Sequence, residues 1–234
     1  WAVEVTSNKV IKQPLPQGMN IISLGWKDPQ HYYSYDSVDI CGNQNLRLIN
    51  VETGKSEKVM QESFYVISTF PATGEMLYSA SADCKNSPGQ GIYRFSPDEG
   101  SYQKLAEEKA YEFNWLPESR AFFAYPVGVI DENGTRYDPP IKEKSYHPAI
   151  STNGFTAWEV IENRQGRVVV STDSLNWMDI ETGLIDGLLW DPLNGYTLFM
   201  AVDDGTVYTA TFPEFSPMPA GNIPGGIRQM IWTP

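Results

Sequence analysis

The two histidines of the chain, His31 and His147, are the residues best suited to acid–base or nucleophilic catalysis. Neither lies in a G-x-S-x-G segment or a comparable setting. His31 follows a predicted turn and His147 precedes Pro148, so we expect both to have structural roles. Two histidines and two cysteines at unrelated spacings form no C-x-x-C or H-E-x-x-H group, so no zinc site is expected. A glycine-rich phosphate loop is also absent.

Two acidic segments are the remaining candidates for chemistry. They are "VIDENGTRYD", with Asp131, Glu132 and Asp138, and "AVDDGTVY", with Asp203 and Asp204. A glycosidase needs two carboxyl groups across a sugar, and calcium needs about six to eight oxygen ligands. Asn-Gly and Asp-Gly beside β-branched residues are, however, what a tight hairpin turn requires. We interpret both segments as hairpins, and predict no catalytic, cofactor-binding or metal-binding residue and no cofactor.

The composition and net charge of the chain argue against nucleic acid as a partner and against insertion into a membrane. The chain has 234 residues, 29 acidic and 17 basic side chains, and a formal net charge of −12. This charge repels phosphate backbones, so nucleic acid is not an expected partner. No apolar run approaches the roughly 18 residues of a membrane helix, so membrane insertion is not expected. The 19 Gly and 17 Pro residues favour many short strands and turns over long helices.

An internal repeat runs through the chain. Its markers recur at intervals of 36 to 45 residues, at Trp26, Phe70, Trp115, Ser151, Trp190 and Trp232. Each repeat begins with an alternating apolar segment such as "MNIISLGW" or "IDGLLW", passes a polar turn, and continues in an aromatic segment such as "HYYSY" or "TLFMA". A third segment such as "LRLINVETGK" and a more polar fourth complete four strands. The period predicts an all-β fold, a β-propeller of about five to six four-stranded blades.

The two ends of the chain carry parts of a blade. The start, "WAVEVTSNKVIKQPLPQG", has the pattern of a third strand, and the end, "IRQMIWTP", has that of a first strand. Either one shortened blade is shared by both ends and closes the ring, or the chain is a piece of a longer propeller or of a multidomain protein. We favour the second interpretation slightly and expect residues 1–234 to form a single propeller domain.

The repeat segments resemble a known family. "NWLPESRAFFA" and "LLWDPLNGYTLFMA" are similar to the W-S-P-D-G element of TolB-like and WD-related propeller repeats, and "LRLINVETGK" is similar to their strand and turn before T-G-K. The Gly-His and Trp-Asp signatures of true WD repeats are absent. The resemblance implies a propeller fold, but such propellers include transport accessory proteins, peptidase gating domains and scaffolds, so it implies no single activity.

The fourth repeat contains a second resemblance. "VVVSTDSLNWMDI" is similar to the Asp-box of sialidase-like propellers, without its glycine. In that family the residues matching Ser171, Asp173 and Trp177 stabilise the turn between the third and fourth strands, which is a structural role. A competing alignment treats "LNWMDIETGL" as another third strand and places the turn at residues 181–183.

The two cysteines could form a disulfide. Cys41 and Cys84 follow their repeat markers by similar distances, so both fall in the loop between the second and third strands of adjacent blades. Equivalent loops of neighbouring blades lie on the same face of a propeller, which makes a Cys41–Cys84 bond geometrically possible. Such a bond would imply an oxidising compartment. The alternative is two free, partly buried thiols.

Repeats without a catalytic constellation predict a non-enzymatic binding or scaffold module. Its protein partner or small ligand is expected at the propeller channel or on the rim, and its location is expected to be extracellular or periplasmic, in an exported or envelope-associated protein. One alternative is a carbohydrate-binding or glycosidase-like propeller, suggested by the Asp-box-like stretch and the many aromatics. Another is a regulatory propeller of a larger enzyme such as a peptidase, suggested by the unfinished terminal blade.

Overall fold

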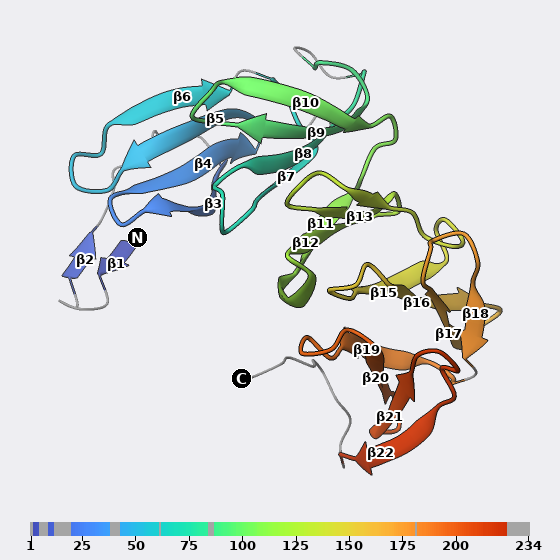
Figure 1. The fold of residues 1–234 in the computed structure, drawn as a ribbon. Helices are drawn as coiled ribbons and strands as arrows, with labels where there is room; N and C mark the ends of the chain where they lie inside the picture. The colour runs from blue at the N-terminus through green and yellow to red at the C-terminus, as the bar shows by residue number, and fades with distance from the viewer. Residues whose placement is uncertain are drawn as a thin grey trace. The chain divides into compact units, whose positions relative to one another are not determined.

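The computed structural model of the chain describes residues 2–4, 9–11, 20–37, 43–60, 62–83, 87–180 and 182–223. Within these ranges the protein is all-β, with five four-stranded antiparallel sheets, a two-stranded sheet and no α-helix (Figure 1). In each four-stranded sheet, strands consecutive in the sequence are neighbours, which is the meander of a propeller blade. The fold class predicted from the sequence is therefore confirmed, with five such blades. No described helix is long and apolar enough to cross a membrane.

The chain divides into two compact units, Trp1–Phe113 (unit 1) and Asn114–Pro234 (unit 2). That residues 1–234 form a single propeller domain stays a prediction. Unit 1 contains the two-stranded sheet, made of β1 (Ala2–Glu4) and β2 (Lys9–Ile11), and two blades. The first blade is made of β3 (Asn20–Asp28), β4 (His31–Ser37), β5 (Asn43–Asn50) and β6 (Ser56–Met60), and the second of β7 (Val66–Thr69), β8 (Met76–Ala80), β9 (Gly91–Ser96) and β10 (Ser101–Ala106).

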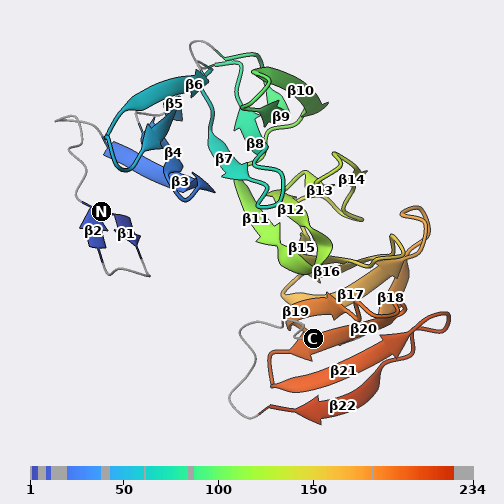
Figure 2. The same cartoon turned by 60° about the vertical axis from the view of Figure 1, so that its left-hand side comes forward.

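Unit 2 contains three blades, which Figure 2 shows in succession. The first is made of β11 (Glu112–Leu116, whose first two residues belong to unit 1), β12 (Ala121–Tyr125), β13 (Gly128–Asp131) and β14 (Arg136–Tyr137), with the 3₁₀ turn η1 (Pro117–Ser119) after β11. The second is made of β15 (Ser145–Ile150), β16 (Thr156–Glu162), β17 (Gln165–Ser171) and β18 (Met178–Ile180). The third is made of β19 (Ile185–Trp190), β20 (Thr197–Val202), β21 (Thr206–Thr211) and β22 (Met218–Asn222).

The second strand of a blade carries much of the core. All five residues of β8 are buried, as are the first four of β12 and the first five of β16. These segments are nearly continuous in apolar residues, as is typical of a strand buried on both faces. In unit 2, Phe123 of β12 meets Trp158 of β16 edge to face, with ring centroids 5.7 Å apart. A second cluster, including Val168, Trp190 and Met200, joins the next pair of blades.

The repeat markers lie at the ends of the first strands, as predicted. Trp115 lies in β11 and Trp190 ends β19, while Phe70 and Ser151 directly follow β7 and β15. The marker Trp232 and the predicted partial strand "IRQMIWTP" lie outside the described residues, so closure of the ring through a terminal blade stays a prediction.

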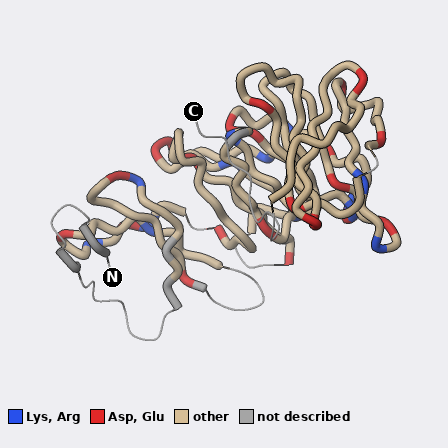
Figure 3. The backbone as a smooth tube through the Cα atoms, turned by 90° about the horizontal axis from the view of Figure 1, so that it is seen from below, with Lys and Arg blue, Asp and Glu red and all other residues tan. Residues whose placement is uncertain are grey.

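The two acidic segments form hairpins, which confirms their interpretation as turns. Residues 132–135 join β13 to β14, and residues 203–205 join β20 to β21. In the first turn the Asp131 carboxylate accepts the backbone N–H groups of Asn133 and Thr135, at 2.9 and 2.8 Å. Figure 3 shows that many acidic residues, in red, lie at such turns.

Candidate functional site

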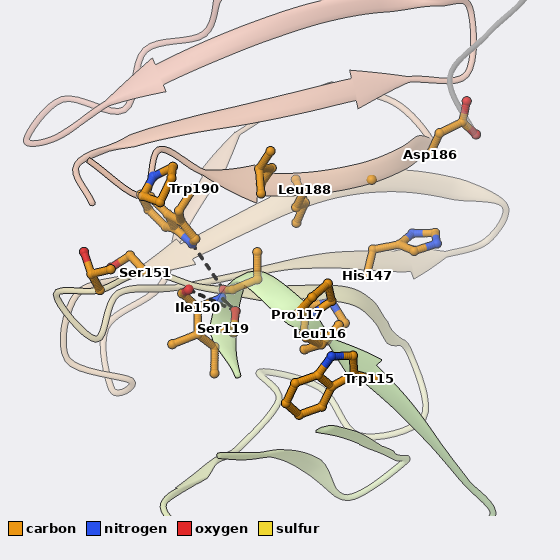
Figure 4. A pocket seen from close by; sticks show the side chains of 16 residues that line it. Trp115, Leu116, Pro117, Ser119, His147, Ile150, Ser151, Asp186, Leu188 and Trp190 are labelled. Atoms are coloured by element: carbon orange, nitrogen blue, oxygen red, sulfur yellow. Dashed lines mark hydrogen bonds between the residues drawn. The ribbon is translucent and has the colours of Figure 1, made fainter. Parts of the chain in front are cut away.

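Unit 2 contains a cavity of about 210 Å³ beside the first strands of its three blades (Figure 4). Its lining comes from β11 and η1, from β15 and the turn after it, and from β19. Strands β15 and β19 are in direct contact. In a propeller the first strands are the innermost, and cavities that bind ligands are concave and mostly apolar with a few polar groups. We therefore treat this cavity as the candidate site.

Most of the cavity wall is apolar. Leu116, Pro117, Ile150 and Leu188 contribute aliphatic surface. The indole rings of Trp115 and Trp190 also line the cavity.

The two indole rings are fixed by contacts within unit 2. Trp190 is 4% exposed and donates its Nε1–H to the carbonyl oxygen of Ala149 at 3.2 Å. Trp115 is half-buried and its ring centroid lies 4.8 Å from that of Phe122. These contacts hold both rings in place, so the apolar part of the cavity is formed without a ligand.

The hydroxyl groups of the two serines in the wall are engaged. Ser119 donates its hydroxyl to the carbonyl oxygen of Ile150 at 3.0 Å and accepts the Ile150 N–H at 3.2 Å, which ties η1 to the end of β15. The Ser151 oxygen accepts the backbone N–H groups of Asn153 and Phe155, at 3.1 and 3.0 Å. Both serines therefore close turns through hydrogen bonds with backbone groups.

A β-bulge directs His147 to the edge of the cavity. Along β15, Tyr146 pairs with Glu159 and Ala149 pairs with Ala157, so His147 and Pro148 together oppose the single residue Trp158. Two residues against one define a bulge, which bends the strand and re-aims a side chain. His147 has a φ of 43°, in the left-handed region that L-residues seldom adopt. Its side chain is 49% exposed.

A buried carboxylate orients the imidazole of His147. Oε2 of Glu159, in β16, lies 2.8 Å from Nδ1 of His147, while Oε1 accepts the backbone N–H of Ile185 at 3.0 Å. The Glu159 side chain is 1% exposed. When the imidazole is neutral and Nδ1 carries its proton, Nε2 is left as a hydrogen-bond acceptor.

The absence of a side chain at Gly166 leaves space for the Glu159 carboxylate. A Cβ at Gly166 would lie 2.7 Å from the Gly183 carbonyl oxygen, 2.9 Å from Cα of Leu184 and 3.0 Å from Oε1 of Glu159. Only a residue without a side chain allows β17 to approach the segment before β19 so closely. The close approach lets Ile185 reach the carboxylate that holds His147.

A second polar group stands at the same end of the cavity. In β19, Ile185 pairs with Val202 and Gly187 pairs with Ala201, so Asp186 is the extra residue of another bulge. Asp186 is exposed. Figure 4 shows Asp186 and His147 at one end of the cavity and Trp190 and Ser151 at the other. The hydrogen bond from Ile185 to Glu159 brings the two bulges together.

The lining therefore combines an apolar body with a carboxylate and an imidazole at one end, and the imidazole Nε2 is an acceptor when the ring is neutral. Among the described residues that line the cavity, His147 and Asp186 are the ionisable ones and none is Lys or Arg. No group of three or more His, Cys, Asp or Glu side chains suited to a metal ion occurs among the described residues. The arrangement can enclose an apolar group and accept hydrogen bonds from a donor attached to it.

The other acidic and histidine candidates from the sequence do not line this cavity. His31 has Nδ1 2.9 Å from Oδ1 of Asp28 and Nε2 3.1 Å from the Asn50 amide nitrogen, so both ring nitrogens are engaged, in agreement with a structural role. Glu132 forms an ion pair with Arg120 at 2.8 Å, and Asp138 with Arg136 at 2.5 Å. Asp203 and Asp204 belong to the β20–β21 turn.

Ser171 and Asp173 meet in the turn between β17 and β18, the third and fourth strands of their blade. The Ser171 hydroxyl donates to Oδ1 of Asp173 at 3.1 Å. The same carboxylate accepts the backbone N–H groups of Asn176 and Leu175, both at 2.8 Å. These hydrogen bonds, with that of Asn176 the strongest influence, lower the pKa of Asp173 far below its usual range.

Trp177, the third Asp-box-like residue, is partly buried against the cluster of Phe123 and Trp158. β18 is a fourth strand, and Gly183 lies between two blades, so the competing alignment with a third strand here is not observed. Membership of the Asp-box family stays a prediction.

Cys41 and Cys84 lie outside the described residues, so their disulfide also stays a prediction. Sequence reasoning missed the site residues that matter most in the structure. It assigned His147 a structural role and did not single out Glu159 or Asp186. The His-Pro pair inside an alternating strand was the one local signal of a bulge, because proline cannot donate to the strand ladder.

No protein-family model matches the chain, and no curated protein is significantly similar to it in sequence. Similar solved structures include TolB from Acinetobacter baumannii, with 16% identity and a TM-score of 0.38 over 88% of this chain and 56% of that one. They also include PorZ from Porphyromonas gingivalis, described as an essential surface component of the type-IX secretion system, with 12% identity and a TM-score of 0.47 over 87% of this chain and 29% of that one.

An oligogalacturonate lyase from Vibrio parahaemolyticus is similar with 10% identity and a TM-score of 0.42, over 86% of this chain and 64% of that one. The chain spans less than two thirds of the length of each of these three proteins. These similar structures include an enzyme and a component of a secretion system, and their sequence identities to this chain are low. We therefore infer no activity of this chain from them.

Proposed function

We propose that the chain is a non-enzymatic β-propeller binding module, which holds a small ligand or a side chain of a protein partner in the unit 2 cavity. The observation that carries this proposal is an apolar cavity with two polar groups at one end, His147, which Glu159 orients, and Asp186. Binding sites for small molecules have this composition, in which apolar area supplies affinity and a few polar groups supply orientation.

The wall favours binding over catalysis. The hydroxyl groups of Ser119 and Ser151 are both engaged in closing turns. A glycosidase-like site would need two carboxyl groups across the substrate. Asp186 is the one carboxylate among the described lining residues, and Glu159, behind His147, is buried and already holds His147 and Ile185.

An exported or envelope-associated setting is part of the same proposal. It is supported by the sequence resemblance to TolB-like repeats. It would also suit the predicted Cys41–Cys84 bond, which needs an oxidising compartment. Fractionation of the source cells, with detection of the natural protein in each fraction, tests this setting, and recovery from the cytosol alone would contradict it.

Binding in the cavity is tested with a neutral probe, 2-phenylethanol, followed by the indole N–H resonances in ¹H–¹⁵N spectra of the full chain. We expect the probe to shift the Trp115 and Trp190 resonances in a saturable way. Leu188→Arg, which fills the cavity with a charged chain, should abolish the shift. Leu193→Arg is the matched control, because Leu193 is 81% exposed and does not line the cavity. An unchanged shift in Leu188→Arg, or no saturable shift in the unmodified protein, would reject the cavity as the binding site.

A further inference from the structure

We infer that the cavity selects amphipathic cations, that is, ligands with an apolar or aromatic body and a primary ammonium group. The inference rests on the proposed function, since it names the ligand class of the same cavity. Its basis is the chemistry of the lining, in which both ionisable groups can accept a hydrogen bond and none is a fixed cation.

The polar end of the cavity suits a ligand group that donates hydrogen bonds. Asp186 presents an exposed carboxylate, which accepts hydrogen bonds only. His147 has Nδ1 engaged by Glu159, so Nε2 is the free ring nitrogen and accepts a hydrogen bond when the imidazole is neutral. An ammonium carries three N–H donors and a positive charge, which suits a cavity end lined by hydrogen-bond acceptors.

The charge around the cavity favours the same ligand. The carboxylate of Glu159 is 1% exposed behind His147, and Asp186 adds a negative charge at the opening. The whole chain carries a formal charge of −12. A carboxylate or phosphate ligand would meet like charges with no Lys or Arg in the lining to receive it.

The apolar wall suits the body of such a ligand. Leu116, Ile150 and Leu188 provide aliphatic surface, and the half-buried ring of Trp115 offers a face to an aromatic group or a cation. In Figure 4 the ionisable residues His147 and Asp186 stand at one end of the cavity, and aliphatic and aromatic residues line much of the remainder. This distribution matches a molecule with an apolar body and a single charged terminus.

The test compares three probes with the same phenyl body and different ends: 2-phenylethylamine, 2-phenylethanol and 3-phenylpropanoate. Titrations use the full chain at about pH 8, where an alkylammonium is charged. We expect the amine to bind about ten-fold tighter than the alcohol and the carboxylate to bind more weakly than either. The amine should also shift the Nε2 resonance of His147 and leave that of His31 unchanged.

Asp186→Asn should weaken the amine about ten-fold and leave the affinity for the alcohol within about two-fold, because it removes one charge-assisted hydrogen bond. The matched control is Glu214→Gln, which removes an equal charge from an exposed turn residue of unit 2 away from the cavity. Equal affinities for amine and alcohol, or equal loss in both variants, would overturn the cation inference while leaving the cavity as a binding site. Failure of all three probes to bind would instead reject the proposed function itself.

Discussion

Glu159 holds the imidazole of His147 from inside the protein, with Oε2 2.8 Å from Nδ1 and Oε1 accepting the Ile185 N–H at 3.0 Å. One carboxylate of a second strand therefore links a bulge in the first strand of its own blade to the first strand of the next blade. A buried charge is stable only when its oxygens are hydrogen-bonded. The geometry of the cavity is thus tied to the packing of two blades.

Removing this carboxylate should destabilise unit 2. We expect Glu159→Ala to lower the free energy of unfolding by about 3 kcal/mol, since it leaves the Ile185 N–H unpaired in the interior and opens a small cavity. Glu159→Gln keeps an amide oxygen and should cost about 1 kcal/mol. Urea unfolding followed by tryptophan fluorescence measures both, and equal losses in the two variants would show that the hydrogen bonds to Glu159 contribute little.

Gly166 should tolerate no side chain. In Gly166→Ala the new Cβ would lie 2.7 Å from the Gly183 carbonyl oxygen, and backbone atoms would have to shift. We expect a loss of about 2 kcal/mol in the free energy of unfolding, typical of overpacking, together with a change in the His147 ring resonances. The control is Gly221→Ala, because no atom lies within 4 Å of a Cβ there. A loss no greater than that of the control would contradict the close approach of β17 to this segment.

The turn at Asp173 should make stability depend on pH in the acid range. Hydrogen bonds from the N–H groups of Asn176 and Leu175 lower the pKa of Asp173 in the folded protein. Its carboxylate therefore stabilises the fold above the ordinary aspartate range near pH 4 and loses this effect as the pH falls through that range toward the lower folded pKa.

Asp173→Ala is accordingly expected to be less stable than the unmodified protein at neutral pH, with the difference shrinking as the pH is lowered from about 5 to about 3. Urea unfolding at a series of pH values measures the difference. Glu214→Gln serves as the control for a lost exposed charge. A difference that stays constant across this series would show that ionisation of Asp173 is not what stabilises the turn.

The predicted Cys41–Cys84 bond has a direct chemical test. Alkylation under denaturing conditions before reduction should leave the mass of the protein unchanged if the bond is present, and alkylation after reduction should add two alkyl groups. Labelling of both thiols without a reductant would show two free cysteines. Cys41→Ser should then leave one thiol reactive without reductant, which assigns the bond to this pair.

Much of the fold could be predicted because its signals are local. Alternation in "IDGLLW" and "HYYSY" marks strands, and the residues around Asn133-Gly134 and Asp204-Gly205 mark turns that close between strands only a few positions apart. The repeat markers, Trp115 among them, recur at similar intervals because each repeat forms one four-stranded sheet.

By itself the sequence determined an all-β chain of repeated four-stranded sheets, because strand pairing and turns depend on neighbours along the chain. Only the tertiary structure decided that His147, Glu159 and Asp186 share one site. His147 and Glu159 are 12 residues apart and Glu159 and Ile185 are 26 apart, on three different strands. Two bulges and the packing of adjacent blades bring these residues together, and neither leaves a periodic pattern in the sequence.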